Sequence, residues 1–148
     1  MKRLLFIILF LISALNILFL TNCNKPQIYT VGEWEENQQK ERSSEALNDA
    51  IFWDEAKYHI GETLTVYGKV ASAYYYKEGK NDPTFLNIGN PHPNPDRLTV
   101  LIWGNNRSNF SVAPEVYYSG KTIYVYGLIE KYEGVPQIDV KSPDQIIE

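Results

Sequence analysis

One ten-residue phrase occurs twice in this chain of 148 residues. GETLTVYGKV begins at Gly61 and GKTIYVYGLI begins at Gly120, so the copies lie 59 positions apart. Each copy alternates apolar and polar residues and carries a second glycine at its eighth position. Such alternation predicts a half-buried strand. Because a solenoid needs about three or more repeats, we interpret the copies as two strands with one mechanical role in a single domain.

Three further segments have strand-like patterns: 84–89 (TFLNIG), 97–103 (RLTVLIW) and 136–140 (PQIDV). The intervening 74–83 (YYYKEGKNDP) carries turn signals and is expected to be a loop. The proline-rich 90–96 (NPHPNPD) is expected to be an exposed hairpin tip, because proline does not fit a strand interior. The residues expected to face the core are Leu86, Ile88, Leu98, Val100 and Ile102.

The element order is three strands, a short helical turn near Pro114 to Tyr118, and two more strands. This order predicts an all-β fold: a small five-stranded Greek-key barrel with short flanking helices. In such a barrel the first and fourth strands lie side by side, and each needs a small residue where it bends. Gly68 and Gly127 meet that need, as a bulge or a tight bend.

A short helix is expected just before Gly61. Asp54 is a candidate to cap it, Ala56 and Tyr58 are its apolar members, and Gly61 ends it. Gly120 has the same role before the second copy.

Residues 1–22 differ in composition from the rest of the chain. Lys2 and Arg3 precede an almost continuous apolar run from Leu4 to Leu20, which is typical of a signal peptide. A retained transmembrane anchor is the alternative, since about 20 apolar residues can span a bilayer.

The stretch LTNC, ending at Cys23, resembles the lipobox of bacterial lipoproteins. That resemblance implies that Cys23 becomes the lipidated N-terminus, carrying a fatty acid such as palmitate, and that the protein is anchored in the cell envelope outside the cytoplasm. Asn22 departs from the pattern, which has Gly, Ala or Ser there. Loss of residues 1–22 would leave 12 basic and 18 acidic residues, and a net negative charge argues against a simple nucleic-acid binder.

Residues 23–50 are polar and show no apolar stripe. We expect them to form a largely disordered linker between the lipid and a folded domain at 51–148. The alternative is a docking segment for a partner, with Trp34 as its anchor.

Residues from about Trp53 to Ile147 resemble a family of bacterial exported OB-fold domains, which occur alone or beside extracellular nuclease domains. The resemblance depends on WDEAKYHIGETLTVYGKV, PTFLNIG, LTVLIW, YYSGKTIYVYGLIEKYEGVPQIDV and SPDQI, in that order. It implies a nucleic-acid-binding OB-fold, although a fold alone does not establish a function.

An OB-fold binds ligands across its second and third strands and the loops that flank them. Aromatic rings with a few cations suit single-stranded nucleic acid, because bases stack on the rings while Arg or Lys meets phosphate. For Phe85 and Trp103 the alternative is packing against loops and the terminal helix. If phosphate is the partner, Lys69, Lys77, Arg107, Lys121 and Lys131 should share one face. The candidate ligand-binding residues are Tyr74, Tyr75, Tyr76, Lys77, Phe85, Asn87, Thr99, Trp103, Arg107, Lys131, Tyr132 and Gln137.

Catalysis has little support in the sequence. His59 and His92 are the two histidines, and no Cys or His pair has metal-ligand spacing. We interpret Asp96 with Arg97, and Glu130 with Glu133, as solvated turn charges. We therefore expect no enzyme, no metal and no cofactor. Two functions remain: a membrane-anchored module that binds single-stranded nucleic acid or another extended ligand, or an envelope lipoprotein that acts as a protein-interaction or structural module.

Overall fold

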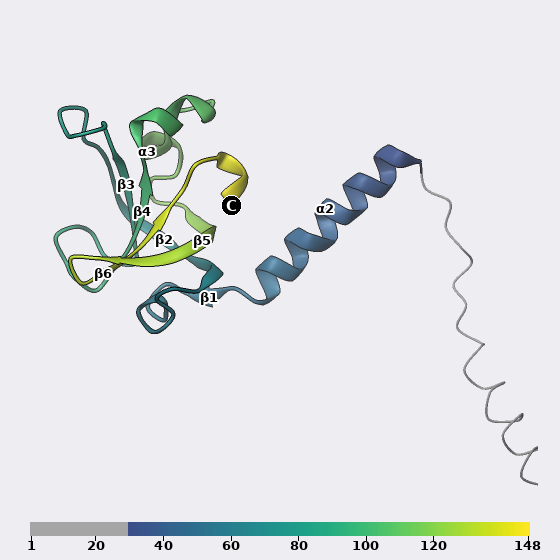
Figure 1. The fold of residues 1–148 in the computed structure, drawn as a ribbon, viewed down its shortest axis with the longest axis horizontal. Coiled ribbons are helices and arrows are strands. Elements are labelled where there is room, and N and C mark those ends of the chain that lie inside the picture. Colours follow the sequence, from purple (N-terminus) through teal and green to yellow (C-terminus); the bar gives the residue numbers. More distant parts are fainter. Residues whose placement is uncertain (1–29) are drawn as a thin grey trace, which may run out of the picture. The chain divides into compact units, whose positions relative to one another are not determined.

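The computed structural model describes residues 30–148 and divides the chain into two units, residues 1–40 and 41–148 (Figure 1). The predictions for the signal peptide, LTNC and Cys23 lie outside the described residues. Within 30–148, no helix has both the length and the apolar character needed to cross a membrane.

Helix α2 (Val31–Asn48) occupies most of the segment that was expected to be disordered, so that expectation is wrong for these residues. A capping box begins the helix: Glu33 Oε2 accepts a hydrogen bond from the Thr30 backbone N–H at 2.9 Å, and Thr30 Oγ1 accepts from the Glu33 N–H at 3.4 Å. The backbone hydrogen bond from Thr30 lowers the pKa of Glu33. Many of the residues that follow are strong helix formers, and they need no apolar stripe to favour a helix.

Residues 41–148 form a mostly β unit with short helices. The strands are β1 (Ile51–Phe52), β2 (Thr63–Tyr75), β3 (Thr84–Ile88), β4 (Leu98–Ile102), β5 (Thr122–Tyr132), β6 (Val135–Asp139) and β7 (Ile146–Ile147). The short helices are η1 (Ala56–Tyr58), η2 (Gly104–Asn109), α3 (Pro114–Tyr117) and η3 (Pro143–Gln145).

Five strands are linked in a ring of pairings. Antiparallel β2–β3 and β3–β4 pairs are followed by a parallel β4–β6 pair and an antiparallel β6–β5 pair. Strand β5 then pairs with β2, and the register runs from Thr63 opposite Leu128 to Lys69 opposite Thr122. The predicted adjacency of the two repeated phrases is therefore confirmed. We call β2, β3, β4, β6 and β5 the five-strand ring (Figure 1).

The core fills the inside of this ring. All five residues predicted to face it, on β3 and β4, are fully buried. Matching residues of the repeated phrases join them, such as Val66 and Val125. The core therefore follows directly from the period-two pattern of the sequence.

The first and second glycines of each repeated phrase are required for different reasons. Gly61 and Gly120 have φ values of +91° and +76°, a region that favours glycine. Gly68 pairs in regular register with β5, so of the two expectations, a bulge or a tight bend, the bulge is wrong. A Cβ at Gly68 would lie 2.6 Å from Ile88 Cγ2, and one at Gly127 would lie 2.5 Å from Ile138 Cγ2. Both positions are therefore glycine because side chains from neighbouring strands approach the backbone closely.

The register irregularity lies instead between Val70 and Ser72. It allows β2 to continue to Tyr75, so Tyr74 and Tyr75 belong to a strand and not to the predicted loop. Tyr76 follows the strand, and its N–H donates to the Pro83 carbonyl at 2.8 Å. Strand β5 likewise extends to Tyr132. These two extensions form the sides of the site described below.

The short helix before Gly61 is present as η1, but its N-cap is Glu55, so the expected cap at Asp54 is wrong. Of its two apolar members, Ala56 is buried, whereas Tyr58 is exposed. The proline-rich segment 90–96 is an exposed loop joining β3 to β4, as predicted.

Candidate functional site: a groove across β3 and β4

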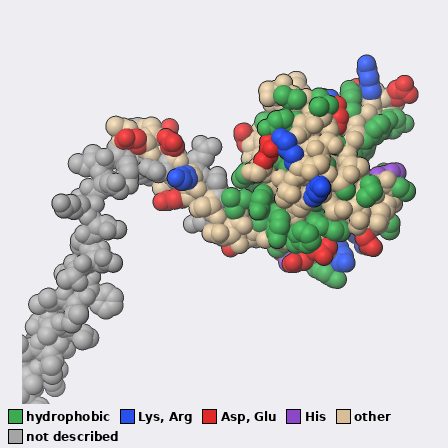
Figure 2. All heavy atoms as spheres, turned by 180° about the vertical axis from the view of Figure 1, so that it is seen from behind, with side chains coloured by type: hydrophobic (Ala, Val, Ile, Leu, Met, Phe, Trp, Pro, Cys, Tyr) green, Lys and Arg blue, Asp and Glu red, His purple; other side chains and the backbone are tan. Residues whose placement is uncertain are grey.

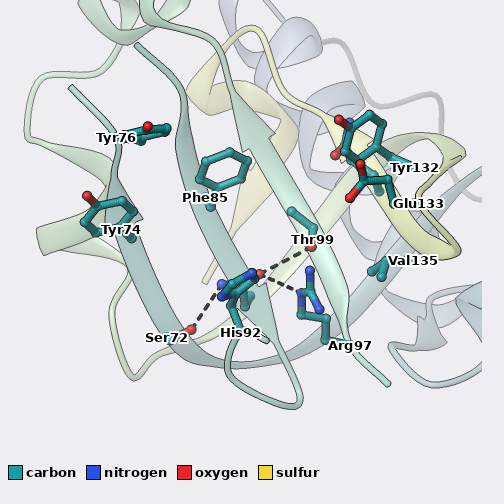
Figure 3. Close-up of a pocket in the computed structure, with 12 residues that line it drawn as sticks. Ser72, Tyr74, Tyr76, Phe85, His92, Arg97, Thr99, Tyr132, Glu133 and Val135 are labelled. Carbon is teal, nitrogen blue, oxygen red and sulfur yellow. Dashed lines mark hydrogen bonds between the residues drawn. The ribbon is translucent and has the colours of Figure 1, made fainter. Parts of the chain in front are cut away.

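A groove of about 580 Å³ runs across the outer surface of β3 and β4 (Figure 3). Strand β2, the β3–β4 loop and the β5–β6 turn supply its edges. Seven predicted ligand-binding residues line it: Tyr74, Tyr76, Phe85, Asn87, Thr99, Tyr132 and Gln137. Five lining residues were not predicted: Ser72, His92, Arg97, Glu133 and Val135.

A row of polar residues crosses four strands at the bottom of the groove. Ser72 on β2 lies opposite Asn87 on β3, Asn87 lies opposite Thr99 on β4, and Thr99 lies opposite Gln137 on β6. Cross-strand partners share one face of a sheet. The strand register therefore brings together residues that are up to 65 positions apart in the chain.

Asn87 holds this row together, although it is only 4% exposed. Its Oδ1 accepts hydrogen bonds from Arg97 Nε at 3.2 Å and from Thr99 Oγ1 at 3.3 Å. Its Nδ2 donates to Ser72 Oγ at 3.1 Å. Figure 3 marks these bonds. We call Ser72, Asn87, Arg97 and Thr99 the polar floor. A hydrogen-bonded network of this kind fixes the positions of its members.

Aromatic side chains stand above the polar floor. Tyr74 and Tyr76 lie on one side of the groove and Tyr132 lies on the other, with Phe85 between them (Figure 3). Tyr74 is 59% exposed and Tyr132 is 62% exposed. The rings of Tyr74 and Tyr76 stack with centroids 6.2 Å apart. We call Tyr74, Tyr76, Phe85 and Tyr132 the aromatic walls. They give a flat ligand faces on which to stack.

The groove carries little net charge. Arg97 is the arginine that lines the groove. Burial lowers the pKa of its guanidinium, which nevertheless stays charged at neutral pH. Its Nη1 donates to the Asn94 carbonyl. Glu133 is exposed at the edge, in the β5–β6 turn, where it and Gly134 both have positive φ. Arg97 and Glu133 are the one Lys or Arg and the one Asp or Glu among the lining residues, so phosphate attraction is limited to one or two contacts.

Five predicted ligand-binding residues do not line the groove: Tyr75, Lys77, Trp103, Arg107 and Lys131. Arg107 binds Glu115 through two hydrogen bonds of 2.8 and 3.2 Å. It also donates to Thr84 Oγ1, and its guanidinium lies 3.7 Å from the centre of the Tyr75 ring. We call Arg107, Glu115, Thr84 and Tyr75 the Arg107 cluster. Trp103 Nε1 donates to Asp139 Oδ2 at 3.0 Å.

The five cations expected to share a face are partly engaged elsewhere. Arg107 is paired with Glu115, and Lys121 Nζ lies 2.7 Å from Glu148 Oε2. On the face that Figure 2 shows, Lys and Arg side chains are scattered among Asp and Glu side chains. The structure therefore places the cation relevant to the groove at Arg97 instead.

Two of the lining residues that were not predicted, Arg97 and Ser72, differ in whether the sequence could have indicated them. Arg97 could have been predicted from the sequence. It lies two positions before Thr99, and residues two apart in a strand lie on the same face of the sheet. Ser72 could not have been predicted. It has the same parity as the core residue Val70, and only the irregularity between them turns Ser72 and Tyr74 outward. Side-chain direction beyond a bulge is not readable from alternation.

Among residues 30–148, no group of three or more His, Cys, Asp or Glu side chains is placed to hold a metal ion. No protein-family model matches the chain, and no curated protein matches it. Among solved structures, similar chains include one described as an aspartyl-tRNA synthetase from Leishmania major Friedlin, with a TM-score of 0.40 and 12% identity. Another is aspartyl tRNA synthetase from Entamoeba histolytica, with a TM-score of 0.37 and 14% identity.

The first likeness covers 63% of this chain and 19% of that chain, and the second covers 57% and 18%. The chain therefore spans less than a fifth of either solved protein. Likeness at this level establishes neither a family nor a function.

Proposed function

We propose that the five-strand ring is an OB-fold and that the chain is a binding module whose groove takes single-stranded nucleic acid. The order of pairings supports the fold, because an OB-fold is a five-stranded Greek-key barrel. The position of the groove supports the function. In that fold the second and third strands and the loops after the first and fourth strands bind oligonucleotides. Here those parts are β3, β4, the segment at Tyr76 and the β5–β6 turn at Glu133.

The observation that carries the proposal is the combination of aromatic walls with a polar floor. Exposed tyrosine rings on both sides of a groove provide stacking surfaces, and base–aromatic stacking tolerates any sequence. The polar floor lies below, where the edge of a stacked base would meet it. A binding role needs no reacting group, so we propose no catalytic activity.

The electrostatics of the groove predict the kind of binding. For single strands the slope of log K against log salt is about −0.7 per neutralised phosphate. With Arg97 as the groove's arginine, one or two phosphate contacts give a slope between roughly −0.7 and −1.4. Stacking then supplies most of the affinity, which reconciles an acidic chain with a nucleic-acid ligand.

We also propose that Cys23 carries the lipid that holds this module at the cell envelope, outside the cytoplasm. The support is the pattern of residues 1–23 in the sequence. Incorporation of radiolabelled palmitate tests it: the full chain is expected to incorporate the label, and a Cys23→Ala variant is not. Equal labelling of both chains would remove the lipid anchor.

A titration tests the groove. A fluorescently labelled 12-nucleotide oligo(dT) is added to the protein at low and moderate salt. Tyr74→Ala and Tyr132→Ala are each expected to weaken binding by about 1–3 kcal/mol, the value of one base stacked on an aromatic ring. Tyr126→Ala is the matched control, because Tyr126 is an exposed tyrosine of β5 that lies outside the groove.

Absence of binding at low salt would remove the nucleic-acid function. An equal loss of affinity in Tyr126→Ala and Tyr74→Ala would leave nucleic-acid binding in place but would remove the groove as its site. The fold assignment does not depend on either result.

One observation favours a second candidate, an envelope module that binds an extended segment of a partner protein. The groove is lined by one arginine, Arg97, and one glutamate, Glu133, and such balance suits a peptide with few charges better than a polyanion. Under this alternative oligo(dT) does not bind, and Tyr74→Ala weakens the capture of the envelope partner instead.

A further inference from the structure

The hydrogen bonds of the polar floor fix which way each amide of the groove points. Arg97 Nε is a donor only, so the Asn87 atom that faces it at 3.2 Å must be the oxygen. Asn87 Nδ2 therefore faces Ser72 Oγ. Gln137 is fixed by the same logic. Its Nε2 lies 3.1 Å from a carboxylate oxygen of Asp139, which accepts only, so its Oε1 is the end without that partner.

The polar floor therefore presents mainly donors to the groove. Asn87 Oδ1 is occupied by two donors. Thr99 donates its hydroxyl hydrogen to Asn87, so its Oγ1 can only accept from a ligand. The hydrogens that remain belong to three side chains: the second N–H of Asn87, the hydroxyl hydrogen of Ser72, and three N–H groups of Arg97, one on Nη1 and two on Nη2, which has no acceptor among residues 30–148.

Acceptors lie on the β5–β6 side of the same groove. Gln137 contributes Oε1 and Glu133 contributes its carboxylate. The groove thus changes from donors at Ser72, Asn87 and Arg97 to acceptors at Thr99, Gln137 and Glu133. A ligand edge that satisfies both parts carries neighbouring acceptors followed by an N–H donor.

We infer that the groove selects guanine or cytosine over adenine and thymine; this inference rests on the proposed function. Guanine offers O6 and N7 as adjacent acceptors, with N–H groups beyond O6. Cytosine offers O2 and N3, followed by its N4 amino group. Adenine has its amino donor beside each acceptor of that edge, and thymine separates its two carbonyls by an N–H. Either of the last two leaves donors of the floor unpaired, which weakens binding.

Competition between oligonucleotides tests the inference on the intact protein. The probe is labelled oligo(dT) of 12 nucleotides. The competitors are the same oligomer with its three central bases replaced by dG, dC or dA, and unlabelled oligo(dT) itself. At fixed salt, the dG and dC competitors are expected to bind at least about fivefold more tightly than the dA and dT competitors.

A variant of the floor provides the second measurement. Asn87→Asp keeps an oxygen for Arg97 and Thr99 but replaces the N–H donor with an acceptor. The preference for dG and dC is expected to fall to within about twofold, while binding to oligo(dT) persists through the aromatic walls. Ser72→Ala removes one donor and should reduce the preference in part. Asn105→Asp is the matched control, because it adds the same charge at an exposed asparagine outside the groove, and it should retain the full preference.

The outcomes separate the two proposals. If no oligonucleotide binds, the proposed function fails and the preference fails with it. If all four competitors bind equally, nucleic-acid binding stands and base selection is overturned. Full retention of the preference in both Asn87→Asp and Ser72→Ala also overturns base selection, and thermal unfolding shows whether each variant is folded.

Discussion

Two arginines lie at opposite ends of β4 and differ in the partners that hold their guanidinium groups. Arg97 precedes the strand and sits in the groove, where its contacts are the side chain of Asn87 and the carbonyl of Asn94. Arg107 follows the strand and is held by both oxygens of Glu115, by Thr84 and by the face of the Tyr75 ring. Arg97 therefore has N–H donors in the groove that are not used, whereas the charge of Arg107 is balanced by the Glu115 carboxylate.

This difference indicates how to tell a structural arginine from a binding one. A bidentate carboxylate satisfies the fork of the guanidinium, and a ligand phosphate would have to displace it. Neutral partners orient the guanidinium without neutralising it. We therefore expect the Arg107 cluster to determine stability and Arg97 to determine affinity, and the following predictions challenge that division.

The largest effect is expected at the Arg107 cluster. Arg107→Ala removes two charge-assisted hydrogen bonds and the contact with Tyr75, and it leaves Glu115 half-buried without its partner. The free energy of unfolding should fall by about 2–3 kcal/mol, as measured by urea denaturation. Affinity for oligo(dT) should not change while the variant is folded.

Arg107→Lys is the informative control. Lysine keeps the charge but cannot form the two parallel hydrogen bonds, so its loss of stability should be intermediate. A variant of Arg107 that is fully stable but binds oligo(dT) weakly would reverse the roles of the two regions.

An affinity loss without a stability loss is expected at Arg97. Arg97→Gln removes the positive charge and the donors of Nη2 while retaining a polar side chain. Binding of oligo(dT) should weaken by about 1–2 kcal/mol, and the salt slope should become less negative by about 0.7, the value of one phosphate. Fluorescence titration at several salt concentrations measures both quantities. An unchanged salt slope would show that Arg97 contacts no phosphate.

The sequence indicated the ring of strands but not the position of its cations. Alternation predicted the core residues of β3 and β4, because burial on one face of a strand follows local period-two patterning. The pairing of β2 with β5 was predicted from the strand order of the expected Greek-key barrel. Helix α2 was missed because the prediction relied on an apolar stripe, which α2 lacks, and did not consider the capping box formed by Thr30 and Glu33. The pairing of Arg107 with Glu115 was not visible, because two residues eight positions apart meet only through the fold of η2 and α3.

The residues of the groove also could be predicted only in part from the sequence. Seven of its residues were predicted, since they lie on the outer face of strands or in the expected loops. Ser72 required the irregularity after Val70, and the network around Asn87 required the register of four strands. Sequence patterns specify which side of a strand a residue occupies, whereas register between strands depends on tertiary packing.

A smaller effect is expected from pH at the Arg107 cluster. Burial raises the pKa of Glu115, but hydrogen bonds from Arg107 and from its own backbone N–H, together with the positive charge of Arg107, hold that pKa below its usual value. A carboxyl whose pKa is lowered on folding stabilises the protein above its unfolded pKa, and this stability is lost as the pH falls through the folded pKa. The gap in unfolding free energy between the natural chain and Arg107→Ala should therefore narrow between about pH 6 and pH 3.

Glu115→Gln supplies the comparison for that titration. With no ionisable group at position 115, the gap between Glu115→Gln and the double variant with Arg107→Ala should stay constant over the same range. A gap that narrows equally in both pairs would assign the pH dependence to other carboxyl groups.

The smallest effect is expected at Lys121. This residue tests whether short distance or burial determines how much an ion pair contributes to stability. Lys121 Nζ lies 2.7 Å from Glu148 Oε2, slightly closer than Arg107 lies to Glu115, and 3.6 Å from the centre of the Tyr117 ring. Its side chain is 38% exposed, however, against 19% for Arg107. Water and salt screen an exposed pair, and most such pairs contribute little. Lys121→Ala should therefore leave both the unfolding midpoint and oligo(dT) affinity unchanged. A loss comparable to that of Arg107→Ala would mean that short distance alone makes a cation structural, and the contrast between Arg97 and Arg107 would then need another cause.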